Sequence, residues 1–85
     1  MIVDFTATWC PPCQSIGPKF VEFASLYTNL KFCKVDVDEA ADVAQAYGIS
    51  AMPTFLVFKD GQKQEDDTLK GADEAALEAL CKKYN

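Results

Sequence analysis

Histidine is absent from this chain of 85 residues, and its absence excludes several kinds of functional site. Ser-His-Asp and Cys-His catalysis both require an imidazole, as do zinc sites that mix Cys with His ligands. Long hydrophobic runs are also missing: the longest, Phe55–Phe58, has four residues, whereas a membrane-spanning helix needs about 20. The chemistry of this protein must therefore come from Cys, Asp, Glu, Lys or Tyr.

Positive charge is scarce as well. The 8 Lys and Arg residues are outnumbered by 13 Asp and Glu residues, which gives a net charge of −5. Nucleic acids and anionic membranes select clusters of basic residues, so neither is expected as a partner. The first residues show no secretory signal, because Asp4 interrupts them and they lack a basic region. We therefore expect a cytoplasmic protein.

Apolar runs and helical periods alternate along the chain, in a composition ordinary for one packed domain spanning residues 1–85. The order β-α-β-α-β-β-α predicts an α/β, three-layer fold with a mixed sheet of about four strands flanked by helices. Because helices join the first three strands, we expect those strands to be parallel. Strands are predicted at Met1–Ala7, Phe32–Val37 and Thr54–Phe58, with a weaker one in Gln62–Lys70 after the hairpin turn Asp60-Gly61.

Three helices are predicted. The first carries the apolar stripe Cys13, Ile16, Phe20 and Phe23, and the last carries the stripe Leu77, Leu80, Cys81 and Tyr84. The second helix runs from an N-cap at Asp38 to Gly48.

The chemistry is expected at a Cys-x-x-Cys pair, Cys10 and Cys13, between the first strand and the first helix. A pair in this setting is typical of a redox-active dithiol. Residues i and i+3 of a helix are neighbours, so a small adjustment can close a disulfide between them. Cys10 precedes the helix, where free N–H groups and the dipole stabilise a thiolate. Cys13 lies on the apolar stripe, so we expect it to be more buried and to react second.

Several motifs in the same order resemble those of the thioredoxin family. They are Val3–Cys13 with its Trp9-Cys10-Pro11-Pro12-Cys13 core, Ala51–Phe55, Phe58–Gly61 and Lys70–Ala72, and the similarity extends from Ile2 to about Tyr84. The resemblance implies a thioredoxin-like fold and a protein thiol–disulfide oxidoreductase that uses the Cys10–Cys13 redox-active disulfide. It also implies disulfide-containing client proteins, electrons from a thioredoxin reductase and NADPH, and no bound cofactor or metal.

The same resemblance assigns roles to further residues. Trp9, Met52, Pro53 and Gly71 would bind an extended client segment, with Pro53 in the cis form opposite Cys10. Pro11 and Pro12 would shape the loop between the cysteines. Asp4 would help to deprotonate Cys13, and a carboxylate in an apolar strand should have a raised pKa that suits this task. Lys34 on the next strand would moderate that shift.

Structural interpretations without a functional role stay open for these residues. Asp4 and Lys34 would then be solvated strand residues, and Pro53 would be a trans proline that begins a strand. Cys33 and Cys81 are expected to be buried structural thiols. Two rival functions remain, a thioredoxin-like binding module without redox activity and a structural zinc module with four cysteine ligands, although Cys33 and Cys81 are isolated in the sequence.

The sequence departs from the family pattern in four places. Pro11 stands where most members have Gly, and Gln14 stands where many have a basic residue. The segment 61–71 is two residues longer than usual, so a bulge or short loop is expected there. The strand and helix that usually precede Met1 are not in this sequence, so an N-terminally shortened domain is expected. The edge of the strand Phe32–Val37 would then be exposed, and a homodimer through it is possible.

Overall fold

A computed structural model describes residues 1–85 and contains the predicted order of elements. The weak fourth strand is divided into two short strands by a 3-10 turn, within the segment 61–71 where the sequence predicts a bulge or short loop. None of the helices has the length and hydrophobicity that crossing a membrane requires. The elements are β1 (Ile2–Thr6), α1 (Pro11–Leu26), β2 (Phe32–Asp36), α2 (Ala41–Ala46), β3 (Thr54–Lys59), β4 (Gln62–Lys63), the 3-10 turn Glu65–Asp67, β5 (Leu69–Lys70) and α3 (Glu74–Tyr84).

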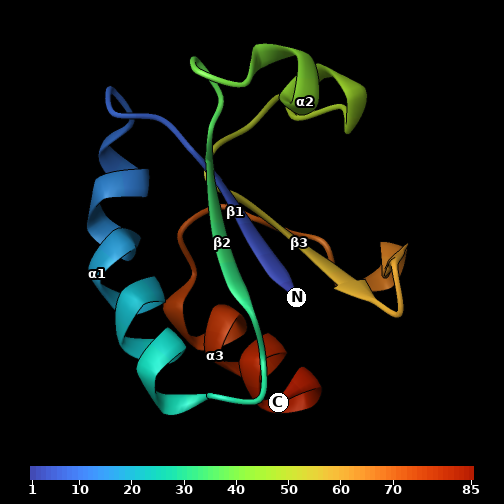
Figure 1. Cartoon of the computed structure of the whole chain (residues 1–85). Coiled ribbons are helices and arrows are strands. Elements are labelled where there is room, and N and C mark those ends of the chain that lie inside the picture. The colour runs from blue at the N-terminus through green and yellow to red at the C-terminus, as the bar shows by residue number, and fades with distance from the viewer.

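The five strands form one mixed sheet in the order β2-β1-β3-β4, with β5 also paired to β3. β1 and β2 are parallel as predicted, but β3 is antiparallel to β1, so the expectation of three parallel strands is wrong. The reason is the short connection. A helix of six residues is about 9 Å long, whereas a strand of five residues spans about 17 Å. α2 therefore stays at the end of the sheet where β2 finishes, and β3 starts from that same end (Figure 1).

Helices cover both faces of the sheet, as a three-layer fold requires. α1 and α3 pack on one face, where the main core joins Ile2 and Phe55 of the sheet to Phe20 and Leu77 of the helices. On the other face, Ala44 of α2 packs against Val3, Phe5 and Leu56. β1 is buried on both faces, which explains its almost unbroken apolar sequence.

The turns follow the local chemistry of the sequence, with one exception. Asp60 and Gly61 both have positive φ, 55° and 78°, as the tight hairpin between β3 and β4 requires. Asp38 does not cap α2, contrary to the prediction, because the helix starts later and its N-cap is Ala40. The carboxylate of Asp36 instead accepts hydrogen bonds from the backbone N–H groups of Asp38 and Glu39.

Candidate active site

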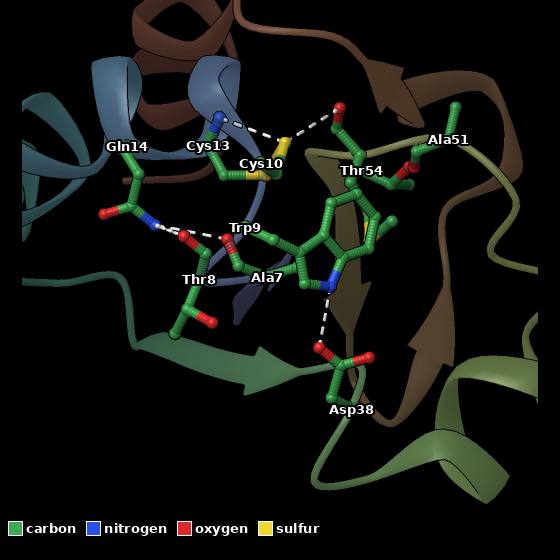
Figure 2. Close-up of a disulfide and its surroundings, with 10 residues drawn as sticks. Ala7, Thr8, Trp9, Cys10, Cys13, Gln14, Asp38, Ala51 and Thr54 are labelled. Carbon is green, nitrogen blue, oxygen red and sulfur yellow. Dashed lines mark hydrogen bonds between the residues drawn. A yellow bond between two sulfur atoms is a disulfide. The ribbon is translucent and has the colours of Figure 1, made fainter.

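Cys10 and Cys13 form a disulfide at the point where β1 gives way to α1 (Figure 2). Their Cα atoms are 5.2 Å apart, within the range that a disulfide requires. Cys10 is the N-cap residue in an extended conformation, and Cys13 occupies the third helical position. The local fold thus places a disulfide at the start of a 16-residue helix.

The prolines between the cysteines restrict which groups can stabilise the Cys10 sulfur. Pro11 and Pro12 fill the first two helical positions, and proline has no N–H to donate. The first available donor is the backbone N–H of Cys13, which lies 3.3 Å from the Cys10 Sγ. In the reduced protein this N–H and the positive end of the helix dipole would favour the thiolate of Cys10.

Burial does not separate the two cysteines in the way the sequence suggested. Cys10 is 4% exposed and Cys13 is 2% exposed, so both are buried in the disulfide form. What distinguishes them is position. Cys10 caps the helix and its sulfur lies 3.6 Å from the carbonyl oxygen of Met52, whereas Cys13 is on the buried stripe of α1. Cys10 is thus the sulfur that lies beside a loop from another part of the chain.

Asp4 is a buried carboxylate in the middle of β1. Its side chain is 1% exposed, and neither of its oxygens has a hydrogen-bond partner. Burial raises the pKa of Asp4 from 3.8 to about 6, because the charged form loses its hydration, and the positive charge of Lys34 opposes part of that rise. Asp4 shares its sheet face with Ile2, which packs against α1. The carboxylate therefore faces the helix whose buried stripe begins with Cys13.

Lys34 lies opposite Asp4 in the parallel pairing of β1 with β2. Its ammonium forms no ion pair within 4 Å of Asp4, and it instead extends toward α1. A Cβ atom added at Gly17 would lie 3.9 Å from the Nζ of Lys34. Lys34 thus influences Asp4 by charge through space rather than by direct contact.

Trp9 is the most prominent exposed group beside the disulfide. Its side chain is 62% exposed, and its indole N–H donates a hydrogen bond of 2.7 Å to Asp38 (Figure 2). Sequence patterns assigned Asp38 to a helix cap and missed this contact. No local signal reveals it, because the two residues are 29 positions apart and meet only through the pairing of β1 with β2.

Two of the other predicted binding residues, Met52 and Pro53, lie in the loop that faces Cys10, and the third, Gly71, follows β5 and contacts that loop. The Met52–Pro53 bond is cis, and Pro53 is buried while Met52 is half-buried. Gly71, with a φ of 100°, donates its N–H to the carbonyl of Pro53 at 2.8 Å. A side chain at that φ would be strained, so glycine suits this position. Met52, Pro53 and Gly71 therefore form one hydrogen-bonded backbone surface near the disulfide.

The remaining cysteines are separate from this site and from each other. Cys81 is buried in α3 as expected, and burial raises the pKa of its thiol to about 11. Cys33 is exposed, contrary to the prediction, because β2 is an edge strand. No group of three or more Cys, His, Asp or Glu side chains is arranged to hold a metal ion, so the geometry gives no support to the zinc module.

Comparison with known proteins agrees with the geometry. Residues 1–83 match the family model for Thioredoxin. A thioredoxin-2 of Pyricularia oryzae is 52% identical over 80 residues, which are 94% of this chain and 46% of that relative. The chain thus spans less than half the length of this relative.

Solved structures show the same similarity in three dimensions. A Plasmodium falciparum thioredoxin superimposes with a TM-score of 0.93 at 48% identity, covering 99% of this chain and 84% of that one. A chain in a structure on the thiol resolving mechanism of yeast mitochondrial 1-Cys peroxiredoxin via glutathione/thioredoxin systems gives a TM-score of 0.90 at 39% identity, covering 96% and 76%.

These relatives and the Cys10–Cys13 pair agree on one chemistry, thiol–disulfide oxidoreduction. The matching residues include the strand, the disulfide and the loop that faces it, so the similarity covers the site as well as the scaffold. The chain belongs to the thioredoxin family.

Proposed function

We propose that this chain reduces disulfides in client proteins, with Cys10 as the attacking thiol and Cys13 as the resolving thiol. The observation that carries the proposal is the position of the Cys10 sulfur. It caps α1, accepts from the Cys13 N–H and lies beside the Met52 carbonyl. A thiolate formed there is stabilised by the helix and next to a backbone that an extended client can pair with.

The reaction proceeds in two exchanges that conserve electrons and protons. The Cys10 thiolate attacks one sulfur of the client disulfide, forms a mixed disulfide and releases the first client thiolate. Cys13 then loses its proton and attacks the Cys10 sulfur, which forms the Cys10–Cys13 disulfide and releases the second client thiolate. Both released thiolates take up protons, one equivalent to the proton lost by Cys13 and one from solvent, to which Cys10 had already lost its own. Two electrons thus pass from the two cysteines to the client.

Asp4 is the proposed proton acceptor for Cys13 in the second exchange. Its buried position on the face toward α1 supports this role, as does its pKa of about 6, because such a carboxylate exchanges protons close to neutral pH. Lys34 acts on Asp4 by its charge and limits the rise of that pKa. Neither residue needs to touch the client.

The client segment would lie across Trp9, Met52, Pro53 and Gly71. The exposed indole of Trp9 offers apolar area, and Asp38 holds it in place. We infer that disulfide-bearing proteins are the partners and that a thioredoxin reductase returns electrons from NADPH to the Cys10–Cys13 disulfide. A cytoplasmic location fits such a partner. The peroxiredoxin structure noted above offers one chemical class of client, a peroxiredoxin.

Association of two copies is a further proposal, supported by the outer edge of β2. β2 pairs with β1 alone, so its other side presents unpaired backbone groups. Beside it lies an open hollow of about 820 Å³, lined largely by apolar side chains such as Val3, Val35 and Phe58. Pairing of two β2 edges would satisfy the backbone and shield part of this surface.

Trapping of clients tests the assignment of the two thiols. Cys13→Ser should accumulate as a mixed disulfide with a protein substrate such as insulin, because Cys10 can attack and nothing resolves the product. Cys10→Ser should form no such adduct, and neither variant should sustain turnover driven by a dithiol. Cys33→Ser, which removes an exposed thiol outside the site, is the matched control and should behave as wild type. Equal trapping by both active-site variants would overturn the assignment.

A further inference from the structure

The side chain of Gln14 ties the active-site loop to the first helix. Its amide nitrogen donates to the carbonyl oxygens of Ala7 at 3.1 Å and of Thr8 at 3.4 Å (Figure 2). Its backbone N–H donates to the carbonyl of Cys10 at 3.1 Å. One residue of α1 is therefore bonded to three carbonyls of the segment that ends in the nucleophile.

This loop has few other ties, because the prolines remove the usual ones. Pro11 and Pro12 have no N–H, so the start of the helix cannot bind the preceding loop through its first two backbone groups. Within the loop, the Cys10 N–H donates to Ala7 at 3.3 Å, a long bond. The indole of Trp9 is held by Asp38. The sulfur of Cys10 is tied to Cys13 by the disulfide and by the Cys13 N–H. Apart from these contacts, the side chain of Gln14 is what fixes the backbone carbonyls of Ala7 and Thr8.

We propose that Gln14 is a positioning residue that sets the pKa of the Cys10 thiol. This inference rests on the proposed role of Cys10 as the attacking thiol. Gln14 acts by holding Cys10 in the cap conformation, in which its sulfur lies 3.3 Å from the Cys13 N–H. The Gln14 amide also binds the carbonyl oxygens of Ala7 and Thr8. These oxygens carry partial negative charge and, if unbound, could turn toward the Cys10 thiolate and raise its pKa. The amide binds them without adding a charge of its own.

Two nearly isosteric variants separate the donor from the shape of the side chain. Gln14→Met retains the length but cannot donate, and Gln14→Glu replaces the donor with a carboxylate that repels the same carbonyls. In both, Cys10 should become harder to ionise, and more so in Gln14→Glu. Because the side chain of Gln14 is exposed, its hydrogen bonds are modest. We expect the alkylation profile of Gln14→Met to move up by about half a pH unit, which is about threefold less thiolate on the acidic limb of the profile. Gln14→Lys restores a donor and adds positive charge, so the Cys10 pKa should return to the wild-type value or fall below it.

The measurement is the pH profile of alkylation of Cys10 in the reduced protein, with the modified residue identified by mass spectrometry. Ser15→Ala is the matched control, because Ser15 is exposed, adjacent in the same helix and without a side-chain hydrogen bond in the structure. It should leave the profile unchanged. A Gln14→Met profile that coincides with wild type would overturn the proposal, as would a loss of stability without a shift of the profile.

The outcome is independent of whether the proposed function holds. Alkylation reports on the thiol itself and needs neither a client nor a reductase. If wild type sustains disulfide reduction and Gln14→Met leaves the profile unchanged, the role of Gln14 fails alone. If the profile shifts but wild type reduces no client disulfide, the proposed function fails and the positioning role of Gln14 stands.

Discussion

Replacing Asp4 with asparagine should stabilise the fold at neutral pH much more than at acidic pH. Asp4 is 1% exposed and its two oxygens have no hydrogen-bond partner, so its charged form is costly to bury. The pKa of Asp4 is about 6 in the folded protein, against an ordinary value of 3.8 that applies to the unfolded chain. Asparagine has nearly the same shape and no charge, so it removes the cost of ionisation while it retains the packing.

The sign follows from proton linkage. The folded state holds the Asp4 proton more tightly, so stability contributed by the protonated group is complete below pH 3.8 and is lost as pH rises through 6. The full penalty above that range is about 3 kcal/mol, from about 2.2 pKa units at 1.36 kcal/mol each. Between about pH 4 and pH 7.5 the penalty grows by about 2.4 kcal/mol. The gain from Asp4→Asn should grow by the same amount.

Urea denaturation of the oxidised proteins at these two pH values measures the difference. The free energy of unfolding of a small domain falls with urea at a slope near about 1 kcal/mol/M. The urea midpoint of Asp4→Asn should therefore exceed that of wild type by roughly 2 M more at pH 7.5 than at pH 4. Asp60→Asn is the control, because Asp60 is exposed at the hairpin turn and asparagine also accepts its positive φ of 55°. A difference between wild type and Asp4→Asn that is equal at both pH values would refute the burial of an ionisable Asp4.

Three further outcomes are expected. Asp4→Asn should slow disulfide turnover most near neutral pH, where wild-type Asp4 is ionised and can accept the Cys13 proton; a pH–rate profile parallel to wild type would contradict this. Pro12→Ala should add an N–H facing the helix cap, lower the pKa of the Cys10 thiol and make the reduction potential less negative; equilibration with glutathione buffers measures it, and an unchanged or more negative value would refute the reasoning. Because the β2 edge is unpaired, analytical ultracentrifugation should show dimers, or thermal unfolding of a monomer should show a low melting temperature. A protein that sediments as a monomer and also unfolds cooperatively above about 65 °C would contradict the association proposal.

Local sequence patterns predicted most of the fold. The strands Ile2–Thr6 and Thr54–Lys59 are apolar and buried, and the stripes of α1 and α3 repeat at helical spacing, so their burial is encoded in each segment. The Asp60-Gly61 turn follows from the two residues themselves. What failed was the direction of β3, which depends on how far a six-residue helix can reach rather than on any residue in the strand.

The site was predictable where the chemistry is local and not where it depends on distant contacts. The pairing of Cys10 with Cys13 and the burial of Asp4 could be predicted from their own segments. The exposure of Cys33 could not, because it depends on which strand forms the edge of the sheet. The bond between Trp9 and Asp38 likewise requires the β1–β2 pairing, and the contacts of Gln14 depend on the path of the loop back toward the helix.

The central claim is that the Cys10–Cys13 pair passes electrons to client disulfides, and coupled turnover tests it most directly. Oxidation of NADPH is followed in the presence of a thioredoxin reductase, insulin and catalytic amounts of this protein. Sustained oxidation that depends on the chain, is lost in Cys10→Ser and is retained in Cys33→Ser is the predicted result. A wild-type rate no higher than that of Cys10→Ser, with folded and fully oxidised protein at the start, would contradict the account.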